Sequence, residues 1–130
     1  MKKTALITIA IVAPLAFVGR WFRHEARLAD NKDLVHVSAR AVHGVYLKNP
    51  NPSQDEIKRA LFALKSESAT NLQVGPDGRP ADPYRTSLRI HHEVKGKQAI
   101  TTVTSAGADR TFDTDDDVRE VVTSEVPGKP

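Results

Sequence analysis

The spacing of hydrophobic residues changes along the chain, and its first part predicts a long helix. Residues 4–19 carry no charge and are almost all apolar. From residue 20 to residue 47, apolar side chains recur among polar ones at Leu28, Val35, Ala39, Val42 and Tyr46. Such spacing places the apolar positions on one face of a helix. The pattern therefore predicts a long N-terminal helix, wholly apolar in its first part and amphipathic in its second.

A second, shorter helix is predicted after a helix-breaking stretch. Residues 49–52 read Asn-Pro-Asn-Pro, which ends the first helix because proline cannot continue one. Ser53, followed three residues later by Glu56, forms a capping box, which is a start signal of helices. The buried face of this second helix is expected to comprise Ile57, Ala60, Leu61 and Leu64.

The C-terminal half predicts strands. Residues 86–94 alternate, with Leu88, Ile90, His92 and Val94 on one face, and residues 99–104 are rich in Thr, Ile and Val. The four residues 95–98 between these segments predict the turn of a β-hairpin.

Two further segments complete the predicted fold. Residues 118–123 supply a third strand and residues 72–74 a short one, whereas residues 75–83, with three prolines and two glycines, predict a loop. Residues 124–130 are expected to be a frayed tail. The fold class predicted is α+β, with a long N-terminal helix, a short second helix and a small three-stranded antiparallel sheet.

The apolar N-terminus predicts a membrane anchor. Trp21 and Phe22 follow the uncharged stretch as interfacial aromatic residues, and together they bring its length close to the roughly 20 residues that span a bilayer as a helix. No Ala-x-Ala motif ends the stretch, so cleavage by a signal peptidase is not expected. Residues 1–22 are predicted to be a transmembrane anchor or an uncleaved signal, and residues 23–130 one extracytoplasmic domain.

Composition narrows the classes of function. A chain of 130 residues, 39% of them hydrophobic, holds one small domain. It has no cysteine, which excludes disulfide frameworks, zinc ribbons and thiol nucleophiles. The net charge of +3 comes from the region of the membrane segment, since residues 1–48 hold eight Lys and Arg against three acidic residues. This distribution does not favour nucleic acid as a partner.

An acidic loop over residues 105–118 offers the clearest candidate chemistry. It carries five aspartates within nine residues, Asp109, Asp113, Asp115, Asp116 and Asp117. Residues 105–120 hold six acidic residues against two arginines, a local net charge of −4. Carboxylates this close repel one another, and calcium, which takes about six to eight oxygen ligands, relieves the repulsion. The loop is not an EF-hand, because Thr114 stands where glycine is needed. A calcium site and a solvated acidic turn both remain open.

The residues that form a motif in this loop are Ser105, Ala106, Gly107, Asp109, Phe112, Thr114, Asp115 or Asp116, Asp117 and Val118. In that order they resemble the C-terminal segment of major, G-type pseudopilins of type II secretion, which commonly read Ser-Ala-Gly-Pro-Asp-Gly-x-Phe-Gly-Thr-x-Asp-Asp-Ile. Ala108 stands in place of proline, and Arg110 and Asp113 in place of two glycines. Since glycine often supplies a positive φ in tight turns, Arg110 and Asp113 are expected to adopt one.

The resemblance implies a pilin-like structural or assembly component, with a loop that calcium attaches to the sheet. It implies a single-pass protein of the bacterial inner membrane, with the membrane, other pilin-like subunits or inner-membrane components of a secretion system as partners. The pseudopilin processing site, Gly followed by Phe-Thr-Leu-Ile-Glu, does not precede the apolar run. The chain is therefore expected to stay in the membrane. The alternative is a free-standing exported calcium-binding module with a cleaved signal peptide.

The histidines do not predict an active site. His36 and His43 share a helix face but have no third ligand at helical spacing. His91 and His92 are neighbours on a strand, so they point to opposite faces. The sequence also has no nucleophile elbow, His-Glu-x-x-His motif or glycine-rich phosphate loop. Neither enzymatic activity nor a small-molecule substrate is expected, and a metal-dependent enzyme is the least favoured alternative.

Overall fold

The computed structural model describes residues 29–67 and 71–127 of the chain. A helix covers residues 29–48 and is followed by the helix α2 (Gln54–Glu67). Strands make up most of the regular structure in the remainder. The molecule is therefore α+β, as the sequence predicts.

The strands form two antiparallel sheets. β3 (Arg89–Lys95), β4 (Gln98–Ser105) and β5 (Val118–Glu125) make a three-stranded sheet in the order β3-β4-β5. β1 (Gln73–Val74) and β2 (Pro80–Ala81) pair in a separate two-stranded sheet. The predicted three-stranded antiparallel sheet is confirmed.

The hairpin between β3 and β4 is tighter than predicted. Lys95 pairs with Gln98, so only Gly96 and Lys97 lie outside the ladder, and not the four residues 95–98. Gly96 has a φ of 62°, which glycine adopts at no steric cost. A two-residue turn of this kind matches the twist of its strands and lets the pairing continue to the end.

The last strand is longer than predicted. β5 continues through Ser124 and Glu125, which pair with Ala99 and Gln98. The Val126 N–H then donates to the Lys97 carbonyl at 2.8 Å. The prediction of a frayed tail from residue 124 is therefore wrong for these residues, because β4 offers a full set of backbone partners beside them.

The segment 75–83 is not the simple loop that its prolines and glycines predict. Pro80 and Ala81 form β2 and are buried. Proline lacks an N–H, but the Pro80 carbonyl still accepts a hydrogen bond from the Leu88 N–H at 3.0 Å. β2 pairs on one side with the short strand β1 and on the other side with the chain that leads into β3. The prediction of a loop is wrong here because the composition of the segment does not reveal these two partners.

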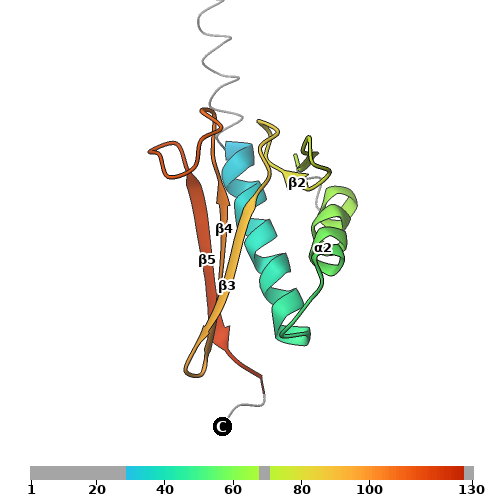
Figure 1. Cartoon of the computed structure of the whole chain (residues 1–130), viewed down its shortest axis with the longest axis vertical. Coiled ribbons are helices and arrows are strands. Elements are labelled where there is room, and N and C mark those ends of the chain that lie inside the picture. Colours follow the sequence, from blue (N-terminus) through green and yellow to red (C-terminus); the bar gives the residue numbers. More distant parts are fainter. Residues whose placement is uncertain (1–28, 68–70, 128–130) are drawn as a thin grey trace, which may run out of the picture.

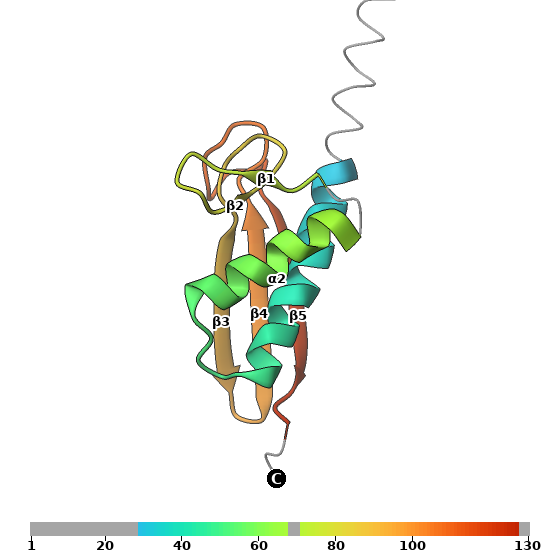
Figure 2. The same cartoon turned by 90° about the vertical axis from the view of Figure 1, so that its right-hand side faces the viewer.

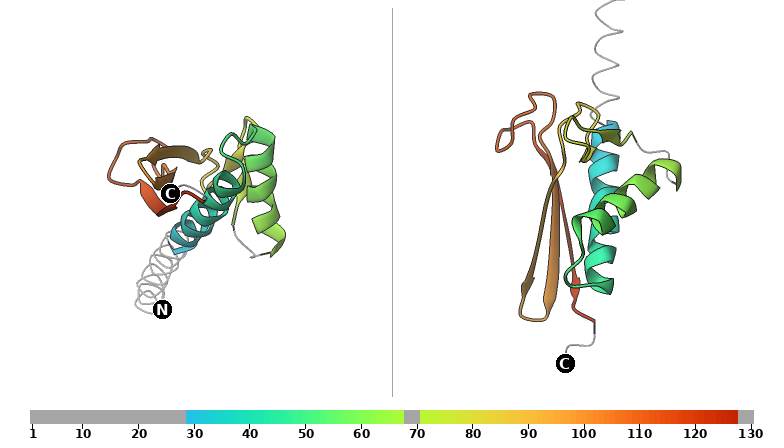
Figure 3. Two further views of the ribbon diagram at one scale, coloured as in Figure 1. Left: turned by 90° about the horizontal axis from the view of Figure 1, so that it is seen from below. Right: turned by 45° about the vertical axis from the view of Figure 1, so that its right-hand side comes forward.

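The helices and the sheet form layers. The helix over residues 29–48 lies along one face of the three-stranded sheet, and α2 lies on the far side of that helix (Figure 1 and Figure 3). Figure 2 shows α2 crossing in front of the longer helix, with the sheet behind both. The longer helix is therefore the central layer of the described domain.

The predicted helix stripes supply most of the core. Val35, Ala39 and Val42 have no exposed surface, as the spacing predicts, and Tyr46 is half-buried. Leu28, the first residue of that stripe, lies outside the described residues. The core cluster comprises Leu34, Val35, Ala39, Val42, Ile57, Leu61, Leu72, Leu88 and Val103. It joins both helices to the sheet, so one core serves the whole domain.

The capping box of α2 forms on one side only. The Glu56 N–H donates to the Ser53 hydroxyl at 3.1 Å, as predicted. The Glu56 carboxylate instead accepts a hydrogen bond from the Asn49 amide at 3.3 Å. Glu56 thus connects the start of α2 to the end of the preceding helix.

The predicted transmembrane anchor over residues 1–22 lies outside the described residues. Within the part of the chain that is described, no helix is both long enough and apolar enough to cross a bilayer.

Candidate functional site

The acidic loop connects β4 to β5. It lies at the same end of the domain as the first described residues of the helix over residues 29–48, as Figure 1 shows. A hydrogen bond of 2.9 Å from the Asn31 amide to the Ser105 hydroxyl joins that end of the described helix to the start of the loop.

The loop backbone is tightly folded. Gly107, Arg110 and Asp113 have φ angles of 75°, 57° and 65°. Arg110 and Asp113 stand at the two positions where the pseudopilin pattern has glycine, so the expectation of positive φ there is confirmed. A Cβ on Gly107 would collide with the Asp116 carbonyl, so this position requires glycine for space as well as for conformation.

Asp109 organises the first half of the loop. Its carboxylate accepts hydrogen bonds from the Thr111 N–H at 2.9 Å and from the Thr114 hydroxyl at 2.6 Å. Both hydrogen bonds lower the pKa of Asp109 below its usual value because they stabilise the charged form, and the bond from the Thr114 hydroxyl has the larger effect. Asp109 is therefore held as a carboxylate.

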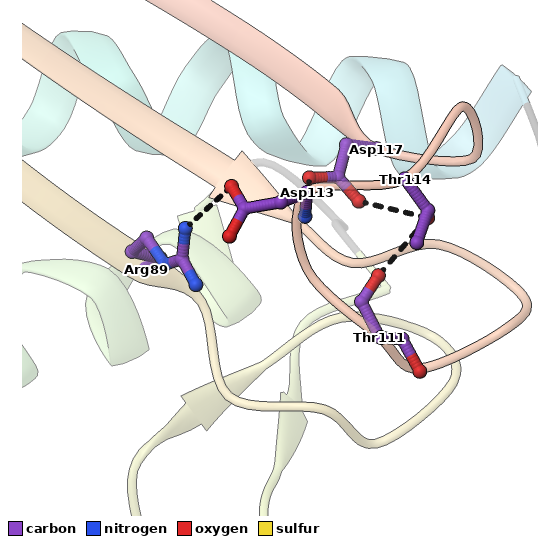
Figure 4. A network of polar contacts seen from close by, with 5 residues as sticks. All are labelled: Arg89, Thr111, Asp113, Thr114 and Asp117. Atoms are coloured by element: carbon purple, nitrogen blue, oxygen red, sulfur yellow. Dashed lines mark hydrogen bonds and ion pairs between the residues drawn. The ribbon is translucent and has the colours of Figure 1, made fainter.

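Asp116 and Asp117 close the loop on its own backbone. Asp116 accepts from the Asp109 N–H at 3.0 Å, and Asp117 accepts from the Asp113 N–H at 2.7 Å. Figure 4 shows Thr114 between the Thr111 carbonyl, at 3.1 Å, and the Asp117 carboxylate, at 3.4 Å. One hydroxyl proton cannot serve these acceptors and Asp109 together, and the shortest contact, to Asp109, is the strongest.

Arg89 attaches the loop to β3. Its guanidinium donates to the Asp113 carboxylate at 3.1 Å (Figure 4) and lies 4.1 Å from the centre of the Phe112 ring. The side chains of Arg89 and Asp113 are 48% and 71% exposed, so solvent screens the ion pair. Within the described residues, Arg89 is the one cation in an ion pair with a loop aspartate.

The structure thus places all five predicted ligand residues on one loop but does not gather them around one point. Within residues 29–67 and 71–127, no group of three or more histidine and acidic side chains is positioned to hold a metal ion. Asp115 is exposed and makes no hydrogen bond or ion pair in this part of the chain.

The chemistry of the donors suits a hard cation. The loop offers only oxygen ligands, namely carboxylates, hydroxyls and carbonyls, and these are the ligands that calcium takes. Asp115 has both oxygens free, and the carboxylates of Asp109, Asp113, Asp116 and Asp117 accept from neutral groups or from the exposed Arg89. Binding an ion would require that some of these internal hydrogen bonds exchange for bonds to the metal.

Beneath the acidic loop lies a buried polar cluster that the sequence does not indicate. Asp82 has no exposed surface, and its carboxylate accepts from the N–H groups of Tyr84 and Thr86 at 2.9 and 3.0 Å. Its other oxygen accepts from the Ser105 hydroxyl at 2.6 Å. The Asp82-Pro83-Tyr84 sequence is a usable signal for the turn, because aspartate commonly caps the N–H two residues on. Nothing local indicates Ser105 or Asn31 as its neighbours.

The histidines serve the contact between helix and sheet. Nδ1 of His36 lies 2.9 Å from the Glu120 carboxylate. His43, which is 5% exposed, is hydrogen-bonded through Nδ1 to the Thr101 hydroxyl at 2.8 Å and through Nε2 to the Ser124 hydroxyl at 2.7 Å. His92 faces the helix, because its ring stacks on that of Tyr46, whereas Nε2 of His91 lies 3.9 Å from the Glu93 carboxylate. The prediction that His91 and His92 point to opposite faces agrees with their separate partners.

Two cavities lie near these elements. One of about 490 Å³ lies between α2, β2 and β3 and includes Lys58, Arg79 and Leu88 in its lining. A neighbouring one of about 310 Å³ is lined by Arg89 and Phe112 among others. Neither lining includes a histidine or an aspartate of the acidic loop.

Comparisons with known proteins assign no function to the acidic loop. No family model matches the chain, and no curated protein and no solved structure is significantly similar to it.

Proposed function

We propose that this protein is a membrane-anchored, pilin-like structural or assembly component, resembling a type II secretion pseudopilin, whose acidic loop is stabilised by calcium. Asp109, Asp113, Asp115, Asp116 and Asp117 are the proposed ligand residues. The bacterial inner membrane is the proposed location, with the domain on its extracytoplasmic side.

The arrangement of the helix supports the structural role. The helix over residues 29–48 packs on the sheet along its whole described length, from Asn31 near its start to Tyr46 near its end. A helix that forms the central layer of a domain and follows an apolar N-terminal segment in the sequence is suited to connect that domain to a membrane or to other helices.

One observation carries the calcium proposal. Five aspartates stand within nine residues, and only one cation, the exposed Arg89, forms an ion pair with any of them in the described chain. Their carboxylates are instead used to cap the backbone of a loop with positive φ at Arg110 and Asp113. An ion of charge +2 would reduce the repulsion and hold the strained backbone together.

Thermal unfolding of the full chain in detergent micelles tests this proposal. An ion that binds only the folded state at a hundred times its dissociation constant stabilises it by about 2.7 kcal/mol. For a domain of this size the expected rise in Tm between excess chelator and excess calcium is about 10 °C. The double variant Asp115→Ala with Asp117→Ala is expected to remove the rise.

A matched control keeps the charge change but moves it away from the loop. Glu93→Ala with Glu125→Ala removes two exposed or half-buried carboxylates from the sheet, and it should leave the rise in Tm intact. Identical melting curves of the unmodified chain with and without calcium would overturn the calcium proposal and leave the loop a solvated turn.

A further inference from the structure

Three buried polar side chains from distant parts of the sequence meet at the base of the acidic loop. Asn31, Asp82 and Ser105 have no exposed surface. The Ser105 hydroxyl donates to the Asp82 carboxylate at 2.6 Å and accepts from the Asn31 amide at 2.9 Å and from the Gly107 N–H at 3.2 Å. This hydroxyl therefore uses its one proton and both lone pairs.

From Ser105 the contacts continue into the acidic residues. The Gly107 N–H is fixed by the Ser105 hydroxyl, and the Gly107 Cα is packed so closely on the Asp116 carbonyl that no side chain fits. Asp116 in turn accepts from the Asp109 N–H at 3.0 Å. A contiguous chain of contacts thus runs from Asn31, in the helix over residues 29–48, to two of the proposed ligand residues.

We propose that Asn31, acting through Ser105, positions the acidic loop for its cation, so that cation binding and the seating of the helix on the sheet are coupled. Asn31 is a positioning residue and not a ligand. The proposal rests on the proposed function, because it takes the loop to be the calcium site. By thermodynamic linkage, calcium would also hold the part of the helix around Asn31 more firmly on the sheet.

The hydrogen bonding of Asn31 makes the proposal testable apart from stability. The Asn31 amide is buried, and within the described residues its carbonyl oxygen has no hydrogen-bond partner. Burying an unpaired oxygen costs free energy, and Asn31→Leu removes this oxygen together with the bond to Ser105. The Ser105 hydroxyl keeps Asp82 and the Gly107 N–H as partners, so the lost bond and the removed oxygen largely offset each other and the stability of the fold should change little.

The experiment is a calcium titration of the full chain in detergent micelles, by calorimetry. Losing one hydrogen bond that orders the site corresponds to a fall in affinity of about five- to tenfold. Asn31→Leu is expected to weaken calcium binding by this factor while its melting temperature in chelator stays close to that of the unmodified chain.

Ser38→Ala is the matched control. Ser38 lies on the same helix and is equally buried, but its hydroxyl has no hydrogen-bond partner in the described chain and so makes no hydrogen bond to the loop. Its calcium affinity should equal that of the unmodified chain. Equal affinities for all three proteins would overturn the coupling while leaving the calcium site itself established.

Amide hydrogen exchange separates this result from a failure of the proposed function. If the unmodified chain binds no calcium, the proposed function fails. The link from Asn31 to the loop is then measured by the exchange of the Gly107 and Asp109 N–H groups, which should be faster in Asn31→Leu than in Ser38→Ala. Equal exchange rates would overturn the positioning role of Asn31 as well.

Discussion

Thr101 is shared by two histidines, and its single proton limits how they can be protonated. The Thr101 hydroxyl lies 2.8 Å from Nδ1 of His43 and 2.8 Å from Nδ1 of His92. It can donate to only one of them, so the other ring must carry its own proton on Nδ1. The Tyr46 ring stacks on the His92 ring, with 3.9 Å between the ring centres, and so covers one side of the histidine pair. Two neutral rings satisfy this arrangement completely.

Acid is expected to destabilise the domain through this pair. Burial lowers the pKa of His43. The pKa of His92 is lowered chiefly by burial, and further by the charges of His43 and His91. The unfolded chain then binds more protons than the folded one, so the stability is fully present above the unfolded pKa of about 6.5 and is lost as the pH falls below it. The urea midpoint should decrease between pH 7.5 and pH 5.

Variants identify the groups responsible. His43→Asn should make the urea midpoint less dependent on pH over this range, because it removes the buried ring of the pair and leaves only the half-buried His92. His91→Gln, on the exposed face of β3, should keep most of the dependence. Asp109, whose pKa is lowered, loses its contribution only as the pH falls through the more acidic carboxyl range, so its effect is separate. A midpoint that does not change with pH would contradict the role of the histidine pair.

At the scale of elements, replacing glycine by alanine is expected to change the free energy of unfolding in opposite directions at two positions. Gly107 has a φ of 75° and no space for a Cβ, so Gly107→Ala should destabilise the fold by about 1–3 kcal/mol. Gly44 lies within the helix over residues 29–48, and a Cβ there would meet nothing within 4 Å. Gly44→Ala should therefore stabilise the fold by about 0.5–1 kcal/mol. Urea unfolding measures both changes, and equal effects would contradict this account of the loop.

The elements that the sequence predicts correctly are those specified by local patterns. The stripe of Val35, Ala39 and Val42 and the start of α2 at Ser53 depend on local spacing alone, and both are confirmed. The alternation in β3 is confirmed as far as His92, whereas Val94 is exposed. The positive φ of Arg110 and Asp113 follows from a turn motif that is local too. These features can be predicted because neighbours in the sequence determine them.

The features that the sequence does not predict depend on distant partners. β2 forms because it pairs with β1 and because the Pro80 carbonyl accepts a hydrogen bond from Leu88, and β5 continues to Glu125 because Gln98 lies beside it. In the candidate site, the five aspartates are evident from composition, whereas the contact of Ser105 with Asn31 joins residues 74 positions apart. Contacts at such separation depend on the packing of the helix on the sheet, which no local pattern specifies.

For the whole molecule, the state of the N-terminus decides between the anchored protein and the exported module. Residues 4–19 are uncharged, so retention of this segment should hold the protein in the membrane through alkaline carbonate washing. The intact mass of the protein from the membrane fraction should correspond to a chain that begins at Met1 or Lys2. A mass that begins beyond residue 19, with the protein in the soluble fraction, would contradict the anchor and support the exported module.

The contact between the long helix and the sheet has a mechanical consequence. Burial of apolar residues is non-directional, so it opposes a shift of the helix along the sheet by one turn, about 5.4 Å, less specifically than hydrogen bonds do. The polar residues of the helix forbid such a shift, because Asn31, His36 and His43 each meet a different side chain of the sheet, at Ser105, Glu120 and Thr101. A shift of one turn would break all three bonds together. A pull on the helix would therefore be resisted until it dislodged the helix in a single step, without gradual sliding.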